Sequence, residues 1–190
     1  LLNGARDITV GGRYAYIAAD AGVVVLDLDQ PLAPRLVATV AMSSVRAVAQ
    51  QFRYLFVTDS EGLKVIDITD PRTPQLLHDN TIAIDSAHKV FVARTYAYVA
   101  AGAEGLVIVD VSRPRSMQLY QRFNDGIEDA RDVVVASTNA SLFAYVADGA
   151  AGLKVVQLTS PETQPRYYGF SPDPKPQFIA RYPTSAPALS

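Results

Sequence analysis

Short runs of apolar residues alternate along the whole chain with polar segments rich in Gly, Pro, Asp and Asn. Each run is about five to seven residues long and rich in Val, Ile, Tyr and Phe, which favour β-strands. Runs of this length are typical of strands rather than helices, and the polar segments between them are typical of turns. The pattern predicts an all-β chain.

One phrase recurs four times, with a proline always nine residues after its first glycine. Its copies, spaced by about 40 to 47 residues, read "GVVVLDLDQP" from Gly22, "GLKVIDITDP" from Gly62, "GLVIVDVSRP" from Gly105 and "GLKVVQLTSP" from Gly152. Repeats of this period indicate that the chain is built from one small structural unit used four times.

Each copy of the phrase is accompanied by three other apolar runs, two before it and one after it. The run after the proline reads "PRLVATV" from Pro34, "PQLLHDN" from Pro74, "MQLYQRF" from Met117 and "PQFIARY" over 176–182. Four short strands in a unit of this length are the blade of a β-propeller. The predicted blades cover 5–40, 44–80, 87–123 and 130–182, the last with an insertion at 162–175.

The phrase itself has a physical explanation at both of its ends. Its glycine allows a tight turn with positive φ between the second and third strands. Asp27, Asp67 and Asp110 end the third strand, where a carboxylate is expected to accept the N–H groups of the following turn. The proline then fixes the turn into the outer strand.

This wording resembles the LVIVD-repeat family, whose name stands here as Leu106-Val107-Ile108-Val109-Asp110. Only one unit contains the name in full, and Gln157 replaces the aspartate in the last unit. The resemblance implies a bacterial or archaeal propeller, exported to the periplasm or cell surface, with no common catalytic set. It also implies a protein partner, since some relatives accompany multihaem cytochromes.

The last residues resemble the beginning of another unit. "SAPAL" at 185–189 lines up with "SVRAV" at 44–48, which begins an inner strand. We therefore expect 185–190 to start a further blade of a larger, six- to eight-bladed propeller. Further residues of a longer protein, another copy or another chain would complete it. The alternative is a closed four-bladed ring.

Composition removes several classes of function. The 190 residues carry a formal net charge of −2, so no basic excess indicates nucleic-acid binding. No apolar stretch is long enough to span a bilayer, and no targeting segment is recognised. The chain has no cysteine and two histidines, which leaves little material for a catalytic triad or a zinc site. We predict no catalytic residue, cofactor or metal.

Basic residues recur at the start of each predicted inner strand, near the mouth of the central channel. They are Arg6, Arg46, His88 and Arg131. One hypothesis is that this basic column binds a small anion or serves an enzyme. The competing interpretation is structural, because an aspartate ends the second strand of three units. It pairs Arg6 with Asp20, Arg46 with Asp59 and Arg131 with Asp148, whereas the unit with His88 has Gly102 instead.

The fourth unit carries two elaborations, which the blade topology places on one face. They are the loop 136–142 and the insertion 162–175, and their candidate partner-binding residues are Asn139, Tyr167, Tyr168 and Phe170. Aromatic side chains on loops are typical of protein-binding surfaces. Alternatively, the insertion only covers an apolar patch or reaches a further blade.

The sequence therefore favours a non-enzymatic propeller that acts as a scaffold or a protein–protein interaction module outside the cytoplasm. A structural role beside a multihaem cytochrome is the version that the family resemblance suggests. The alternative is a small-anion binder or an enzyme that uses the basic column.

Overall fold

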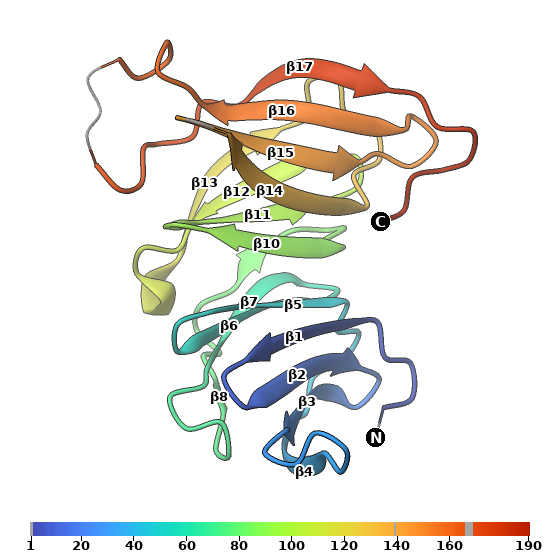
Figure 1. The fold of residues 1–190 in the computed structure, drawn as a ribbon, viewed down its shortest axis with the longest axis vertical. Coiled ribbons are helices and arrows are strands. Elements are labelled where there is room, and N and C mark those ends of the chain that lie inside the picture. Colours follow the sequence, from blue (N-terminus) through green and yellow to red (C-terminus); the bar gives the residue numbers. More distant parts are fainter. Residues whose placement is uncertain (1, 139, 166–168) are drawn as a thin grey trace.

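The computed structural model describes residues 2–138, 140–165 and 169–190, which form four antiparallel sheets in chain order (Figure 1). Blade 1 contains β1 (Asp7–Gly11), β2 (Tyr14–Ala19), β3 (Gly22–Asp27) and β4 (Arg35–Val40). Blade 2 contains β5 (Ala47–Gln51), β6 (Tyr54–Thr58), β7 (Gly62–Asp67), β8 (Gln75–Leu76) and β9 (Ile82–Ala83). Blade 3 contains β10 (Lys89–Ala93), β11 (Tyr96–Ala100), β12 (Leu106–Asp110), the 3-10 helix η1 (Pro114–Ser116) and β13 (Gln118–Phe123). Blade 4 contains β14 (Asp132–Thr138), β15 (Ser141–Ala147), β16 (Leu153–Thr159) and β17 (Gln177–Tyr182).

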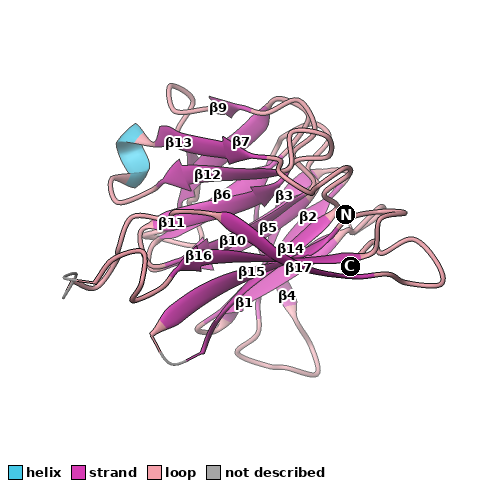
Figure 2. Cartoon of the chain, turned by 90° about the horizontal axis from the view of Figure 1, so that it is seen from above, coloured by secondary structure: helices cyan, strands magenta, loops and turns pink. Residues whose placement is uncertain are grey.

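In blades 1, 3 and 4 the strands follow one another as hairpins, so strand order equals chain order; blade 2 does the same up to β8, and its β9 pairs with β7. The first strands β1, β5, β10 and β14 lie next to one another in succession. In blades 2 and 3 the later strands extend away from them toward one side (Figure 2). This arrangement of hairpin sheets around their first strands is a β-propeller, as the repeat predicted. No helix in the described part of the chain is long and apolar enough to cross a membrane.

The outer strand of blade 2 differs from its prediction. We expected one run over 74–80, but β8 ends at Leu76 and pairing with β7 resumes only in β9. Asn80 lies in the interruption, where its side chain donates to the carbonyl of Pro114 and accepts the N–H of Met117 at 3.0 Å. The strand is thus broken where it is bonded to blade 3.

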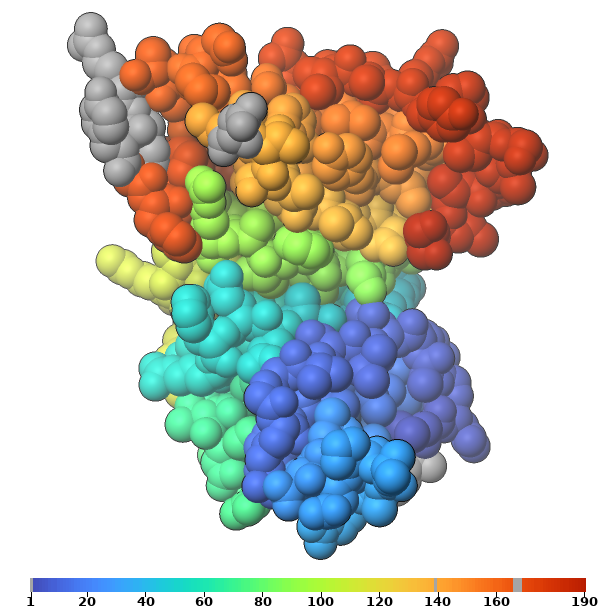
Figure 3. All heavy atoms as spheres, viewed as in Figure 1, coloured from blue at the N-terminus to red at the C-terminus, as the bar shows by residue number. Residues whose placement is uncertain are grey.

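Three apolar clusters fill the spaces between successive blades. The first strand of each later blade contributes an equivalent valine to the cluster before it: Val48 to blade 1, Val90 to blade 2 and Val133 to blade 3. In Figure 3 blade 1, in blue, and blade 4, in orange and red, lie at opposite ends of the molecule, as packing of each blade on its neighbours in the chain requires. Burial of these faces, at roughly 25 cal/mol per Å² of apolar surface, holds the blades together.

The outer faces of blades 1 and 4, at the two ends of this series, are not covered by a neighbouring blade as the interior faces are. Ile8 occupies the position of the three buried valines, yet it is 57% exposed. Val10 is also exposed on the same side of β1, and Val134 is exposed on the opposite side of blade 4. Ala188 pairs with Gly149 through an isolated bridge, as Ala130 pairs with Gly102 where blade 4 begins. The number of blades in the complete ring stays a prediction.

The local expectations for the repeated phrase are confirmed. Its glycines all have positive φ, from +76° to +133°. The three aspartates that end β3, β7 and β12 accept a turn N–H two residues later, at 2.8–2.9 Å, from Asp29, Thr69 and Ser112 respectively.

Candidate functional site

The basic column occupies one structural position in every blade. The backbone N–H of each residue donates to the second strand of its own blade, at 2.7–2.9 Å, and the residues are Arg6, Arg46, His88 and Arg131. Their side chains, however, have different partners. The four residues therefore hold equivalent positions without sharing a role.

Arg6 has the partner that the structural interpretation predicted, because its Nη2 lies 2.7 Å from Oδ1 of Asp20. Both side chains are about half exposed. For Arg46 the predicted pairing with Asp59 is wrong: its Nη1 donates to the carbonyl oxygen of Ala87, at 3.0 Å, in the connection to blade 3.

The predicted pair of Arg131 and Asp148 is also wrong. Arg131 binds Asp129, two residues before it, with Nε at 2.8 Å and Nη2 at 2.7 Å from Oδ2. Asp148 accepts the backbone N–H groups of Glu128 and Asp129 instead. These bonds tie the connection between blades 3 and 4 to the end of β15.

Lysines, and not the predicted arginines, form the ion pairs with these two aspartates. Nζ of Lys64 lies 2.7 Å from Oδ2 of Asp59, and Nζ of Lys154 lies 3.4 Å from Oδ2 of Asp148. Each lysine lies in the third strand of the same blade, and both carboxylates are buried. The two aspartates are thus structural, as expected, but through lysine pairs.

His88 does not add a fourth cation to the column. Its pKa is lowered, first by burial and then by the positive charges of Arg131 and Arg46. The imidazole is therefore neutral near pH 7, and two of the three arginines have carboxylate partners. Anion binding by the column stays a prediction that the geometry does not favour.

Sequence reasoning missed a second set of charges on the inner strands. Nζ of Lys89 in β10 lies 2.6 Å from Oδ1 of Asp7 in β1, and Oδ2 of Asp7 accepts the N–H of Val48 at 2.9 Å. The pKa of nearby Asp132 is raised, chiefly by burial. These contacts join three blades. Among the described residues, no group of three or more His, Asp or Glu is placed to hold a metal ion.

On the elaborated face, the predicted loop 136–142 is wrong. β14 and β15 continue their pairing to Thr138 and Ser141, so the segment is the end of a lengthened hairpin. Thr is well suited to strands, which explains why a polar segment extends the ladder. Asn139 lies outside the described residues.

The insertion folds back onto blade 3. Oγ of Ser171 lies 2.5 Å from Oγ1 of Thr95, and Oδ1 of Asp173 accepts the hydroxyl of Tyr96 at 2.8 Å. Tyr120 donates to the carbonyl of Pro174 at 3.1 Å. These bonds fix the second half of the insertion beside the turn between β10 and β11. Tyr167 and Tyr168 lie outside the described residues.

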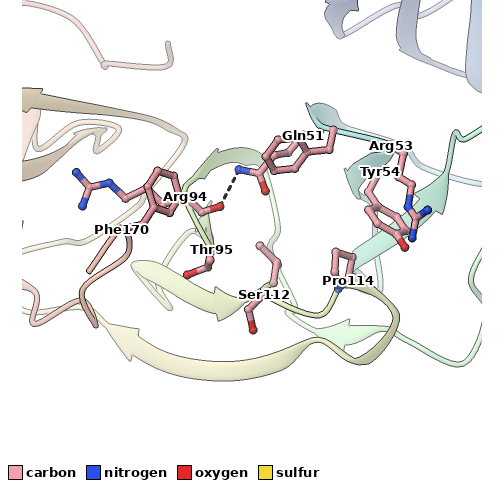
Figure 4. Close-up of a pocket in the computed structure, with 10 residues that line it drawn as sticks. Gln51, Arg53, Tyr54, Arg94, Thr95, Ser112, Pro114 and Phe170 are labelled. Carbon is pink, nitrogen blue, oxygen red and sulfur yellow. Dashed lines mark hydrogen bonds between the residues drawn. The ribbon is translucent and has the colours of Figure 1, made fainter. Parts of the chain in front are cut away.

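Phe170 immediately precedes this bonded segment, and its side chain is 76% exposed. It borders a pocket of about 470 Å³ between blades 2 and 3, which we call the turn pocket (Figure 4). The pocket is lined by Gln51, Phe52, Arg53, Tyr54, Arg94, Thr95, Val111, Ser112, Pro114 and Phe170. The lining contains two arginines, several aromatic rings and no acidic residue.

The two arginines of the turn pocket lie over aromatic rings. The guanidinium carbon of Arg53 is 5.4 Å from the ring centre of Tyr54, and that of Arg94 is 6.0 Å from the ring centre of Phe170. Gln51 crosses the blade boundary to donate to the carbonyl of Arg94 at 2.7 Å (Figure 4). Sequence reasoning missed this pocket, because it arises where turns of two blades meet.

Comparisons with known proteins agree on the repeat and the fold. The family model described as LVIVD repeat matches four segments, which are 4–42, 45–79, 85–125 and 128–166. Together they cover most of the chain. No curated protein matches the sequence.

Three solved structures illustrate the likeness in fold. Citrobacter koseri AztD is 15% identical, with a TM-score of 0.52, over 83% of this chain and 44% of that one. The β-propeller domain of Myceliophteria thermophila Cps50 (Swd1) is 14% identical, with a TM-score of 0.56, over 83% and 53%. A chain from the structure of S. cerevisiae dbp5 bound to nup159 and gle1 is 12% identical, with a TM-score of 0.55, over 96% and 45%. This chain thus spans about half the length of the structures it matches.

Proposed function

Because the chain belongs to the LVIVD-repeat family, whose units here form the blades of a β-propeller, we propose that it is a non-enzymatic scaffold that binds a protein partner. The docking surface is the face that carries the turn pocket and the insertion at 162–175. Its described part centres on Phe170 and the surrounding turns.

The observation that carries this proposal is the bonding of the insertion to blade 3. Ser171 and Asp173 hold the backbone in place, while Phe170 next to them keeps its ring exposed. A large apolar side chain on a backbone that is already ordered loses little conformational entropy on binding. Such anchored aromatics contribute most of the energy in many protein interfaces.

A known assembly and the family resemblance bear on the kind of partner. One similar chain was solved in the complex of dbp5 with nup159 and gle1, so the fold is compatible with assembly. For this chain we propose a location outside the cytoplasm, in the periplasm or at the cell surface, and a multihaem cytochrome as partner. The support for both is the family resemblance.

We expect Phe170→Ser to weaken capture of the partner at least about fivefold, because it removes the exposed ring without touching the bonds of Ser171. Capture by the immobilised chain, followed by cross-linking, measures the loss. Leu32→Ser is the matched control: Leu32 is fully exposed in the turn between β3 and β4 of blade 1. Equal capture by the two variants would refute this docking surface.

The exposed end faces favour a further partner, and we propose that it is a second copy of this chain. Ile8 corresponds to valines that bury against the preceding blade in the interior of the molecule, Val10 is exposed beside it, and Val134 lies on the opposite, forward side of blade 4. Blade 4 of one copy therefore offers blade 1 of another the kind of surface that blades already use three times within the chain.

In light scattering coupled to size exclusion, we expect the intact chain to have a mass near twice 20.5 kDa. Ile8→Lys introduces a charge into the proposed contact and is expected to return the mass to that of one chain. Leu32→Lys, which adds the same charge away from both faces, should leave the dimer intact. A single-chain mass for the unmodified protein at every concentration tested would rule out the second copy.

A further inference from the structure

We propose that the turn pocket binds an acidic side chain next to an aromatic one in a peptide segment of the partner. This inference rests on the proposed function, and it names the chemistry that the docking surface recognises. It is carried by the two arginines of the pocket, by their positions in the repeat, and by the aromatic walls around them.

Arg53 lacks the partner that the equivalent arginine has in blade 1. In blade 1 the equivalent Arg13 binds Asp27, with Nε at 3.0 Å from Oδ1 and Nη2 at 2.5 Å from Oδ2. In blade 2 the carboxylate equivalent to Asp27 is Asp67, and its Oδ2 lies 2.5 Å from Nη2 of Arg115, which comes from blade 3. Arg53 therefore forms no ion pair within 4.0 Å in the described part of the chain, although it also borders a second hollow that contains Asp67 and Asp70.

Arg94 occupies a turn position where a glycine would fit more easily. Gly12 holds the equivalent position in blade 1, with φ +59° and open space around it. Phe52 and Arg94 hold it in blades 2 and 3, with φ +52° and +57°. A side chain in this left-handed region costs about 1–2 kcal/mol relative to glycine. Phe52 is 86% exposed, so burial of its ring does not offset this conformational cost. A role of the ring in binding accounts for its presence.

The turn pocket has groups that can bind both the acidic and the aromatic side chain of such a peptide. A guanidinium binds a carboxylate through two parallel N–H bonds, and Arg53 and Arg94 each lie against an aromatic ring. Their guanidinium groups lie at opposite ends of the pocket (Figure 4), so an acidic side chain would bind one of them, with the rings between them on its other side. Phe52, Tyr54 and Phe170 supply apolar walls for a ring of the peptide. A pocket without acidic lining has the charge that complements such a segment.

An array of hexapeptides that contain Glu or Asp beside Phe, Tyr or Trp tests the inference, with a matched array in which Gln and Asn replace the acids. We expect the intact chain to bind the acidic array at least about tenfold more tightly, because each neutral peptide loses its charge-assisted bonds. The double variant Arg53→Gln/Arg94→Gln should lose this preference. Arg181→Gln, which removes an exposed arginine in β17, should keep it.

Thermal unfolding of each variant checks that the replacements leave the fold intact. No preference for the acidic array in the intact chain, or a preference that survives in the double variant, would overturn the inference. Its failure is separable from that of the proposed function. If Phe170→Ser abolishes partner capture while Arg53→Gln/Arg94→Gln does not, the docking surface stands and the acidic ligand does not.

Discussion

Gly62→Ala is expected to lower the free energy of unfolding by at least about 3 kcal/mol, because two separate costs add at this position. Gly62 has φ +133°, a conformation that residues with a Cβ rarely adopt. A Cβ built there would lie 2.1 Å from the carbonyl oxygen of Ile82 and 2.6 Å from the amide nitrogen of Ile84. Both atoms belong to backbone, so neither can rotate away, and the strand that carries them must shift.

Urea unfolding followed by tyrosine fluorescence measures this loss, since the chain has ten tyrosines and no tryptophan. Gly12→Ala is the matched control: its φ is +59°, but no atom lies within 4 Å of the added Cβ. We expect it to cost about 1–2 kcal/mol, which is the conformational part alone. If the two variants were equally destabilised, the close approach of the outer strand would not be the reason for the glycine.

The repeated glycine shows how much of the blade was predictable. Positive φ at this position followed from the turn between the second and third strands, and it holds in all four units. The second reason for the glycine did not follow from the sequence. In each unit the outer strand passes so closely that a Cβ would lie 2.1–2.4 Å from one of its carbonyl oxygens. That strand is distant in sequence, and its path depends on the ladder it forms.

The turn after the third strand was predictable because its bonds are local. A carboxylate and the N–H two residues later are close in almost any chain with that spacing, and three units confirm it. The partners of the buried charges were not predictable by the same reasoning. They depend on which side chains two neighbouring strands place side by side, and the prediction succeeded only for Arg6 and Asp20.

A signal for the correct partners was nevertheless present in the sequence. The second residue after the phrase's glycine is lysine in units 2 and 4, which contain Asp59 and Asp148. It is valine in unit 3, where Gly102 stands in place of the aspartate, and in unit 1, where Asp20 is exposed. At this position of the repeat, lysine thus occurs only in the units that have a buried aspartate at the end of the second strand. The turn pocket had no comparable signal, because it joins turns of two blades with the insertion of a third.

Asp148→Ala is the second large expected effect, with a loss of about 3–5 kcal/mol in the free energy of unfolding. The carboxylate of Asp148 is fully buried, and Lys154 beside it has only 4% of its side chain exposed. Alanine removes the partner of a buried ammonium group and leaves the N–H groups of Glu128 and Asp129 without their acceptor. Unsatisfied buried donors add to the cost of the unpaired charge.

A double variant separates these two contributions. Adding Lys154→Met to Asp148→Ala removes the stranded charge, so the double variant is expected to be more stable than Asp148→Ala alone. Asp20→Ala is the matched control, since it breaks an aspartate pair that is about half exposed and should cost about 1 kcal/mol or less. Urea unfolding of the three variants provides the comparison. If Lys154→Met restored no stability to Asp148→Ala, the unpaired N–H groups of Glu128 and Asp129 would account for the whole loss in the free energy of unfolding. The ion pair with Lys154 would then contribute nothing to stability.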